Sequence, residues 1–367
     1  MPDRWKLTAA LAILALGAGL AAQQLLPADA PSAQAPRDVD IVLCLDTSGS
    51  MEQLIDSARS RLWDVVNEVG EQEPNANLRV GLLSYGSPTP GTGASGYVVV
   101  QSALTNDLDA LYATMWGLHT DGGDEYVGWV LEDALEKMPW STSDNAARLI
   151  FVAGNESAYQ GSKDPTRIAA RAKVQGFKIN TLYAGQVNQG VAENWDDVAE
   201  AGGGRFTAIS MADGLVQVAT PHDAEIERLN KALNDTYVPM GEAGRQRYRR
   251  VQEQDERAGR MGAASSAARA LAKGSSVYKN EAWDLVDATT SGKAEPEAVS
   301  APMLPPEMQA MRPAARRAYV ETKKAERDAI KQQMAEIKEA REAWIEENAE
   351  ESEGLGKKMK TIVAEQL

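Results

Sequence analysis

Short apolar runs alternate with amphipathic segments over residues 38–236. The runs with strand character are residues 38–46, 78–86, 96–102, 148–154, 177–185 and 205–210. The segments with helical spacing are residues 51–70, 107–118, 125–138, 164–176, 192–204 and 221–237. The first run, "DVDIVLCLD", is almost continuously apolar, as in a strand that is buried on both faces. The alternation predicts an α/β fold with a doubly wound, mostly parallel sheet and helices on both faces.

One strand is expected to run against the others. A loop rich in Pro, Gly and Thr joins residues 78–86 to residues 96–102. Two strands joined by such a loop favour a hairpin. We therefore expect one antiparallel strand at an edge of the sheet.

The pattern changes after about Tyr237, where strand-like runs disappear. Residues 237–300 form a predicted helical region, with one helix over 243–273 and a shorter one over 275–290. The Pro-rich stretch "EPEAVSAPMLPPE" then leads into the last part, residues 301–367. An all-helical C-terminal region is therefore expected to follow the α/β domain.

Residues 301–367 are predicted to contain a long charged helix, over about 306–350, and a tail. The apolar positions of this helix that keep coiled-coil spacing are Ile330, Met334, Ile337 and Trp344. Arg341 interrupts that seam, and two heptads are too few to define a coiled coil. We therefore favour a surface helix that packs back on the chain.

The N-terminus has the layout of an export signal. Arg4 and Lys6 precede an apolar segment that runs from Leu7 to Ala22. If Gln23 and Gln24 are included, the segment reaches Leu26 and is about long enough to span a bilayer. Residues 1–22 are therefore predicted to be a signal peptide or an N-terminal membrane anchor, and residues 23–37 a flexible linker. The expected location is periplasmic, extracellular or anchored to a membrane and facing outward.

Composition excludes several classes of function. The net charge of -15 argues against nucleic-acid binding, which needs a clustered basic face. The single cysteine, Cys44, excludes an internal disulfide framework and a cage of thiolates. Two histidines are too few for a poly-histidine zinc site. No nucleophile elbow, P-loop or nucleophile–base pair is evident, so we do not expect an enzyme.

The stretch "DTSGS" ends the first predicted strand with an unusual set of side chains. Asp46 supplies a carboxylate, and Ser48 and Ser50 supply neutral hydroxyl oxygens. Hard cations such as Mg²⁺ prefer oxygen ligands, and Mg²⁺ is usually held by about one or two protein carboxylates. The alternative is a purely structural role, in which these side chains only cap the helix that follows. The spacing favours a site for a divalent cation at the carboxyl end of the sheet.

Asp-x-Ser-x-Ser at this place resembles the first motif of the metal-ion-dependent adhesion site (MIDAS) of von Willebrand factor type A (VWA) domains. The resemblance extends over residues 38–236 in the order of motifs, strands and helices. The segments "RLIFVAGNES" and "NEAWDLVDA" are also similar to exported bacterial proteins that carry one such domain and a helical C-terminal region. The resemblance implies a VWA/Rossmann-like fold and Mg²⁺ (or Mn²⁺ or Ca²⁺) as cofactor.

Two positions depart from the family pattern. Where the family has a threonine before the third helix, spacing places Glu125, with Asp124 one residue away. Where the family has an aspartate after the fourth strand, this chain has Asn155. The predicted metal residues are thus Asp46, Ser48, Ser50, Glu125 or Asp124, and Asn155. The two departures from the family pattern either move negative charge from one loop to another or weaken metal binding.

The resemblance implies a non-enzymatic, exported binding module. It would capture an exposed carboxylate of a protein partner through a divalent cation at the carboxyl end of the sheet. The alternative is a metal-independent structural or assembly protein of the cell envelope that acts through its helical C-terminal region. The sequence does not indicate an oligomeric state.

Overall fold

A computed structural model describes residues 36–88, 93–209, 218–348 and 355–367. Residues from Pro36 to Leu367 form one compact unit. The predicted signal peptide or anchor, residues 1–22, and nearly all of the predicted linker lie outside the described residues. Within the described ranges, no helix has both the length and the apolar character needed to cross a membrane.

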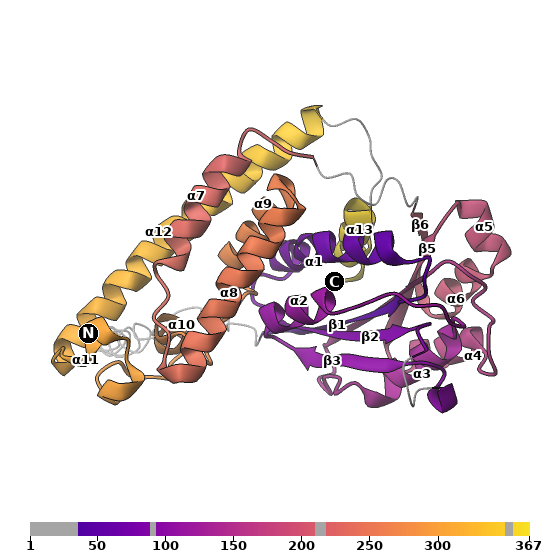
Figure 1. The fold of residues 1–367 in the computed structure, drawn as a ribbon, viewed down its shortest axis with the longest axis horizontal. Helices are drawn as coiled ribbons and strands as arrows, with labels where there is room; N and C mark the ends of the chain where they lie inside the picture. The colour runs from indigo at the N-terminus through magenta and orange to yellow at the C-terminus, as the bar shows by residue number, and fades with distance from the viewer. Residues whose placement is uncertain (1–35, 89–92, 210–217, 349–354) are drawn as a thin grey trace, which may run out of the picture. The chain divides into compact units, whose positions relative to one another are not determined.

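Six strands form the central sheet (Figure 1). They are β1 (Asp38–Asp46), β2 (Asn77–Tyr85), β3 (Val99–Thr105), β4 (Ala147–Gly154), β5 (Phe177–Ala184) and β6 (Gly203–Ile209). Their order is β3-β2-β1-β4-β5-β6, and only β3 runs antiparallel, at one edge. The predicted fold class is confirmed. Strand β3 begins later than expected, after the short 3₁₀ helix η1 (Gly93–Ser95), because Gly96 and Tyr97 have φ angles of 65° and 58°, which do not fit a strand.

Helices cover both faces of this sheet. The helices on the first face are α1 (Glu52–Gln72), α2 (Leu108–Trp116) and α13 (Leu355–Gln366), and those on the second are α3 (Val127–Lys137), α4 (Pro165–Val174) and α6 (Trp195–Ala201). Alternate residues of β1 divide between the faces, with Leu43 in the first core and Cys44 in the second. This division explains why β1 is apolar at every position from Ile41 to Leu45.

The α5–α6 segment differs from the single helix predicted over residues 192–204. A separate helix, α5 (Val187–Ala192), comes first, and α6 begins only at Trp195. Asn194 between them has a φ of 63°, in the left-handed region that interrupts a right-handed helix. The predicted start of α4 is confirmed, because Asp164 accepts a hydrogen bond from the Arg167 amide and Pro165 is the first helical residue.

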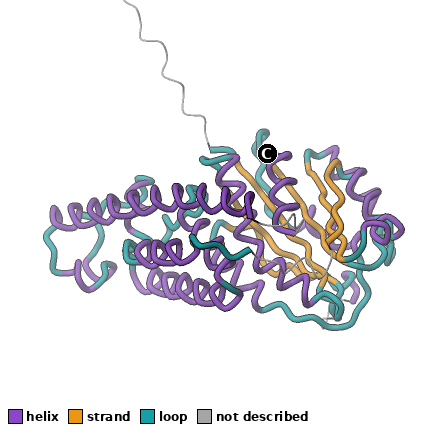
Figure 2. Tube along the Cα trace, turned by 90° about the horizontal axis from the view of Figure 1, so that it is seen from above, coloured by secondary structure: helices purple, strands orange, loops and turns teal. Residues whose placement is uncertain are grey.

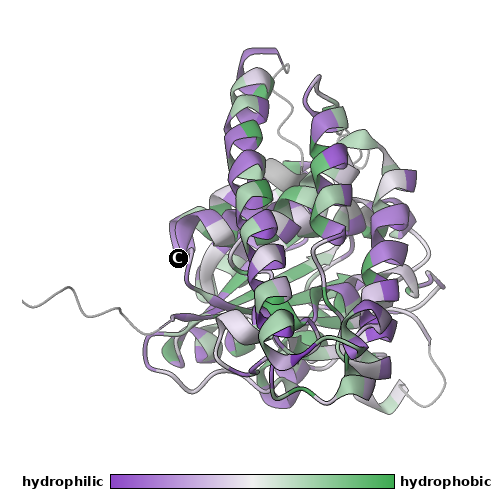
Figure 3. Cartoon of the chain, turned by 90° about the vertical axis from the view of Figure 1, so that its left-hand side faces the viewer, coloured by the Kyte–Doolittle hydropathy of each residue, from purple (hydrophilic) through white to green (hydrophobic). Residues whose placement is uncertain are grey.

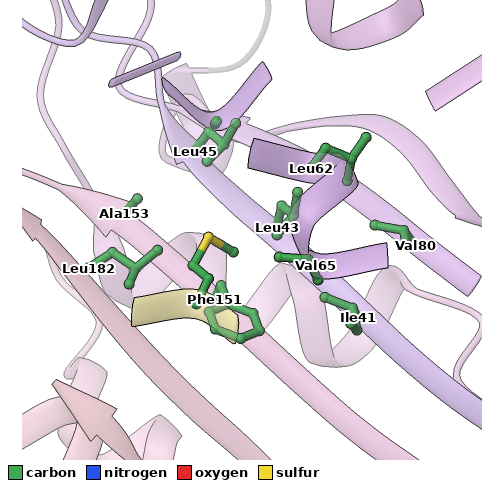
Figure 4. A pocket seen from close by; sticks show the side chains of 11 residues that line it. Ile41, Leu43, Leu45, Leu62, Val65, Val80, Phe151, Ala153 and Leu182 are labelled. Atoms are coloured by element: carbon green, nitrogen blue, oxygen red, sulfur yellow. The ribbon is translucent and has the colours of Figure 1, made fainter. Parts of the chain in front are cut away.

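Helix α13 was predicted only as part of a tail, yet it completes the core on the first face. Met359, Ile362 and Val363 are buried there and lie in the same apolar cluster as α1 and β1. Met359 also lines a cavity of about 20 Å³. Figure 4 shows the side chains around it. It is lined by Ile41, Leu43, Leu45, Ala58, Leu62, Val65, Val80, Phe151, Ala153, Leu182 and Met359.

The helical region between β6 and α13 has six described α-helices. They are α7 (Asp223–Asn234), α8 (Gly241–Met261), α9 (Ala263–Gly274), α10 (Leu285–Thr290), α11 (Pro306–Gln309) and α12 (Pro313–Asn348), with the 3₁₀ helix η3 (Ala301–Met303) before α11. Figure 2 shows this helix-only part beside the strands.

Three predicted helices in this region are shorter than expected. The helix over 243–273 breaks at Gly262, whose φ of 123° suits glycine and few other residues. The helix over 306–350 breaks before Pro313, because proline disfavours the α conformation of the residue before it. The helix over 275–290 is reduced to α10, which Asp284 caps by accepting from the Asp287 amide.

The long helix α12 packs back on the chain, as predicted. Met334 is buried against α7 and α9, with Ile330 and Ile337 beside it. Figure 3 shows hydrophilic and hydrophobic residues alternating along the helices of this region. This pattern is that of an amphipathic surface helix rather than of a coiled-coil seam.

Buried ion pairs join the helical region to the sheet and to itself. Arg269 of α9 donates to Asp109 of α2 over 2.7 Å, and both side chains are almost fully buried. Arg327 of α12 makes a comparable contact with Asp284 over 2.6 Å. Breaking one partner of such a pair leaves an uncompensated buried charge.

Candidate metal centre

Three chain segments bring the predicted site residues to the carboxyl end of the sheet. Asp46 ends β1, and Ser48 and Ser50 lie in the turn before α1. Asn155 follows β4 directly, and Glu125 lies just before α3. Because β1 and β4 are parallel neighbours, the segments that follow them emerge at the same edge.

Ser48 lies at the centre of the hydrogen bonds that join these residues. Its Oγ atom donates to Glu125 Oε1 over 2.8 Å and lies 3.1 Å from Asp46 Oδ2 and 3.2 Å from Ser50 Oγ. The Ser48 amide donates to Asp46 Oδ1 over 2.6 Å. Asn155 Nδ2 donates to Ser50 Oγ over 3.0 Å. The structure therefore brings together five of the six predicted site residues.

The turn around Asp46 is held from β2. The Thr47 amide and hydroxyl both donate to the Tyr85 carbonyl, each over 2.8 Å. Gly86 follows with a φ of 82°, and a Cβ atom there would lie only 2.4 Å from Asp46 Oδ1. Glycine at this position therefore leaves room for the carboxylate.

Glu125 is positioned by a residue that sequence reasoning missed. The Glu125 amide donates to Gln160 Oε1 over 3.1 Å. Gln160 lies in the loop between β4 and α4, and no residue pattern in "NESAYQGSKD" distinguishes it from its neighbours. Glu125 is 1 % exposed, and its Oε2 atom is buried without a hydrogen-bond partner.

Asp124 does not join the cluster. Its side chain is exposed and accepts a hydrogen bond from the Tyr126 hydroxyl over 2.9 Å. Among the hydrogen bonds of the described residues, none connects Asp124 to the other site residues. Of the two predicted alternatives, the structure thus places Glu125 in the site and turns Asp124 toward solvent.

The two buried carboxyl groups lack a neighbouring cation. Asp46 is fully buried, and burial is the main cause that raises its pKa; the hydrogen bond and the charge of Glu125 raise it further. Within the described ranges, no lysine or arginine forms an ion pair with Asp46 or Glu125. A buried charge of this kind needs compensation, by a proton or by a bound cation.

The donor set fits a hard divalent cation. It comprises two carboxylates, two hydroxyls and one amide, and all of them offer oxygen. Glu125 Oε2 is a buried oxygen without a partner, and the ion would supply one. No group of three or more His, Cys, Asp or Glu side chains is placed to hold a metal in the described part of the chain. A metal here would therefore depend on serine and asparagine oxygens as well as on carboxylates.

The family model described as "von Willebrand factor type A domain" matches residues 40–215. No curated protein matches the chain in sequence.

Solved structures show limited similarity. BatB from Bacteroides thetaiotaomicron is 15 % identical, covers 47 % of this chain and 90 % of its own, and has a TM-score of 0.37. The SpRpn10 VWA domain is 16 % identical, covers 49 % of this chain and 94 % of its own, and has a TM-score of 0.37. Proximal thread matrix protein 1 from the mussel byssus is 14 % identical, covers 48 % of this chain and 43 % of its own, and has a TM-score of 0.38. That structure is described as having a zinc-occupied MIDAS motif.

Proposed function

Because residues 40–215 form a VWA domain, a protein-interaction module, we propose that this chain binds a protein partner through a divalent cation at the carboxyl end of the sheet. The cation would be Mg²⁺, with Mn²⁺ or Ca²⁺ as substitutes, and the partner would contribute an exposed carboxylate. The proposal includes export of the protein and no catalytic activity.

The observation that carries the proposal is the buried pair of Asp46 and Glu125 beside Ser48. The two carboxyl groups are fixed by the Ser48 amide and hydroxyl at distances of 2.6 to 3.1 Å. No described cation compensates them, and one Glu125 oxygen has no partner. Such a pair needs positive charge, which a proton supplies in the metal-free protein and which a bound cation would supply in the proposed complex.

Each residue has a distinct part in this proposal. Asp46, Ser48, Ser50, Glu125 and Asn155 would hold the ion. The bound ion would supply positive charge and an open position for an oxygen ligand. Ser50 and Asn155 lie toward solvent, whereas Asp46, Ser48 and Glu125 are buried. The buried side of the site would thus fix the ion, and the exposed side would receive the partner.

A pull-down from envelope fractions tests the proposal. The immobilised wild-type chain is compared with Asp46→Ala and with Glu200→Gln, an exposed control at the end of α6. We expect a partner to be recovered with Mg²⁺ by wild type and Glu200→Gln, and to be lost with a chelator or with Asp46→Ala. Recovery of the same partner in the chelator and by Asp46→Ala would overturn the proposal.

A further inference from the structure

Buried donor atoms without acceptors lie where α1 and α2 of the VWA domain meet α8 and α9 of the helical region (Figure 1). In the described part of the chain, four such N–H donors have no hydrogen-bond partner: Trp63 Nε1 of α1, Trp116 Nε1 of α2, Gln254 Nε2 of α8 and Arg269 Nη1 of α9. We call these four residues the donor cluster. Buried donors in folded proteins are nearly always paired, so such a group indicates an acceptor that the chain does not supply.

Ring contacts hold three of these donors around one tyrosine. The ring centre of Tyr112 is 5.1 Å from that of Trp63 and 6.3 Å from that of Trp116. The Arg269 guanidinium lies 4.6 Å from the centre of the Trp63 ring and 6.0 Å from that of Tyr112. The Tyr112 hydroxyl itself has only a weak acceptor, Met261 Sδ, at 3.7 Å. Neither indole N–H reaches that hydroxyl with the geometry of a hydrogen bond.

Gln254 is tied to both sides of the same group. Arg257 Nη1 donates to Gln254 Oε1 over 3.2 Å, and Arg257 Cζ lies 5.8 Å from the centre of the Trp116 ring. On the other side, Arg269 Nη2 donates to the carbonyl of Val251, which lies one helical turn before Gln254. Gln254 and Arg269 are 0 % and 1 % exposed. The four donors therefore belong to one continuous set of contacts.

The carboxylates that contact Arg269 are occupied by other donors. Arg269 Nε donates to Asp255 and Nη2 to Asp109, each over 2.7 Å. Asp255 also accepts from Lys273 over 2.8 Å, and Asp109 from the Tyr278 hydroxyl. The third nitrogen of the guanidinium, Nη1, is left without an acceptor.

The surroundings of the donor cluster hold one more cation than carboxylate. The cations are Arg59, Arg257, Arg269 and Lys273, and the carboxylates paired with them are Asp56, Asp109 and Asp255. Arg257 is the cation in excess, because no ion pair of the described residues includes it. A single bound negative charge would offset this excess.

An anion suits these donors better than a water molecule does. A water molecule accepts hydrogen bonds but also donates two hydrogens, which need acceptors of their own. The donor cluster offers mainly N–H groups. A halide ion only accepts, so several N–H groups can point to it together.

We propose that a chloride ion, or another monovalent anion of its size, binds at the donor cluster. The ion accepts hydrogen bonds from the two indoles, the Gln254 amide and the Arg269 guanidinium. It thereby holds α8 and α9 against α1 and α2. The site is separate from the cation at the carboxyl end of the sheet, and the proposal does not depend on that cation.

Thermal unfolding of the full chain in different sodium salts tests the proposal. Chloride, bromide and gluconate are compared at fixed pH and ionic strength, with a chelator present so that no divalent cation contributes. We expect chloride and bromide to raise the melting temperature by about 2 °C over gluconate, since a ligand at about ten times its dissociation constant stabilises the folded state.

Two variants remove the features that the anion needs. Trp116→Phe keeps the ring and loses one N–H, and Arg257→Gln removes the excess cation. Each should reduce the rise to less than about 0.5 °C. Trp344→Phe in α12 and Arg312→Gln, at an exposed arginine, are the matched controls and should keep the full rise.

Crystals grown in bromide locate the ion by its anomalous scattering. We expect a bromide peak between Trp116 Nε1 and Gln254 Nε2. Equal melting temperatures of wild type in chloride and gluconate would overturn the proposal. So would an equal loss of the rise in Arg257→Gln and Arg312→Gln, which would reveal a general charge effect, or an ordered water molecule at the donor cluster in place of bromide.

Discussion

The Ser48 hydroxyl donates to Glu125 Oε1 over 2.8 Å and so joins two residues that lie 77 positions apart. This contact assigns the position before α3 to Glu125 and not to Asp124. It also places two carboxyl groups, those of Glu125 and Asp46, on one buried hydroxyl.

Substitution of Glu125 is expected to weaken cation binding far more than substitution of Asp124. Glu125→Gln should weaken Mn²⁺ binding by at least about tenfold, because affinity for hard cations depends on the charge of the ligands. Asp124→Asn, with a side chain turned to solvent, should change it by less than about twofold. Water-proton relaxation measures both affinities, and equal losses would show that the assignment to Glu125 is wrong.

The metal-free protein should lose stability as the pH rises. Burial and the neighbouring Glu125 raise the pKa of Asp46 from 3.8 to about 9 in the folded chain. The folded state therefore holds its proton more tightly than the unfolded state. This contribution is present in full below about pH 4 and is lost as the pH approaches 9.

Asp46→Asn is the matched variant for this pH dependence. The amide of this variant cannot ionise. With a chelator present, the melting temperature of the variant should therefore fall less than that of wild type between about pH 5 and about pH 9. Excess Mg²⁺ should reduce the fall in wild type only. Parallel pH profiles of the two metal-free proteins would contradict the buried charge at Asp46.

The ion pair between Asp109 and Arg269 is expected to hold α2 to the helical region. Asp109→Ala leaves the buried guanidinium with Asp255 and the Val251 carbonyl as partners and should lower the free energy of unfolding by about 3 kcal/mol. Asp328→Asn, on the exposed side of α12, should change it by less than about 0.5 kcal/mol. Urea unfolding measures both values, and similar effects of the two variants would show that burial adds nothing at Asp109.

Helix α13 is expected to stabilise the sheet domain despite its distance in sequence. Met359→Ala enlarges the cavity beneath α1 and should lower the free energy of unfolding by about 2–3 kcal/mol. Met303→Ala, at an exposed methionine of η3, is the control and should have little effect. If thermal or urea unfolding does not distinguish the two variants, α13 does not belong to the core.

The role of α13 also changes how the helical region can be tested. Deletion of residues 240–367 would remove α13, with Met359, Ile362 and Val363, and expose the core that these side chains cover. Loss of partner binding in such a deletion would not separate a metal-independent role of the helical region from unfolding of the sheet domain. A deletion that retains residues 355–367 is needed for that purpose.

The sheet and most of the candidate site could be predicted because their signals are local. The apolar run of β1 and the "DTSGS" stretch that follows it are contiguous, so strand, turn and oxygen ligands can be recognised together. The choice between Glu125 and Asp124 depends on which side chain points inward. The inward orientation of Glu125 depends on the hydrogen bond between its amide and Gln160, and no local sequence pattern encodes this contact.

Helix α13 could not be placed for a related reason. Met359, Ile362 and Val363 have helical spacing, but spacing does not say which distant surface a helix covers. The break at Gly262 was missed because a lone glycine within a helical pattern is often tolerated. These differences all concern tertiary contacts or single backbone angles rather than the sequence of elements.

Calorimetric titration of Mg²⁺ into wild type and Asp46→Ala shows whether the end of β1 holds a divalent cation. We expect a saturable one-site heat for wild type, its loss in Asp46→Ala, and an unchanged heat for the exposed control Glu200→Gln. Indistinguishable heats for wild type and Asp46→Ala would contradict a cation site at the end of β1.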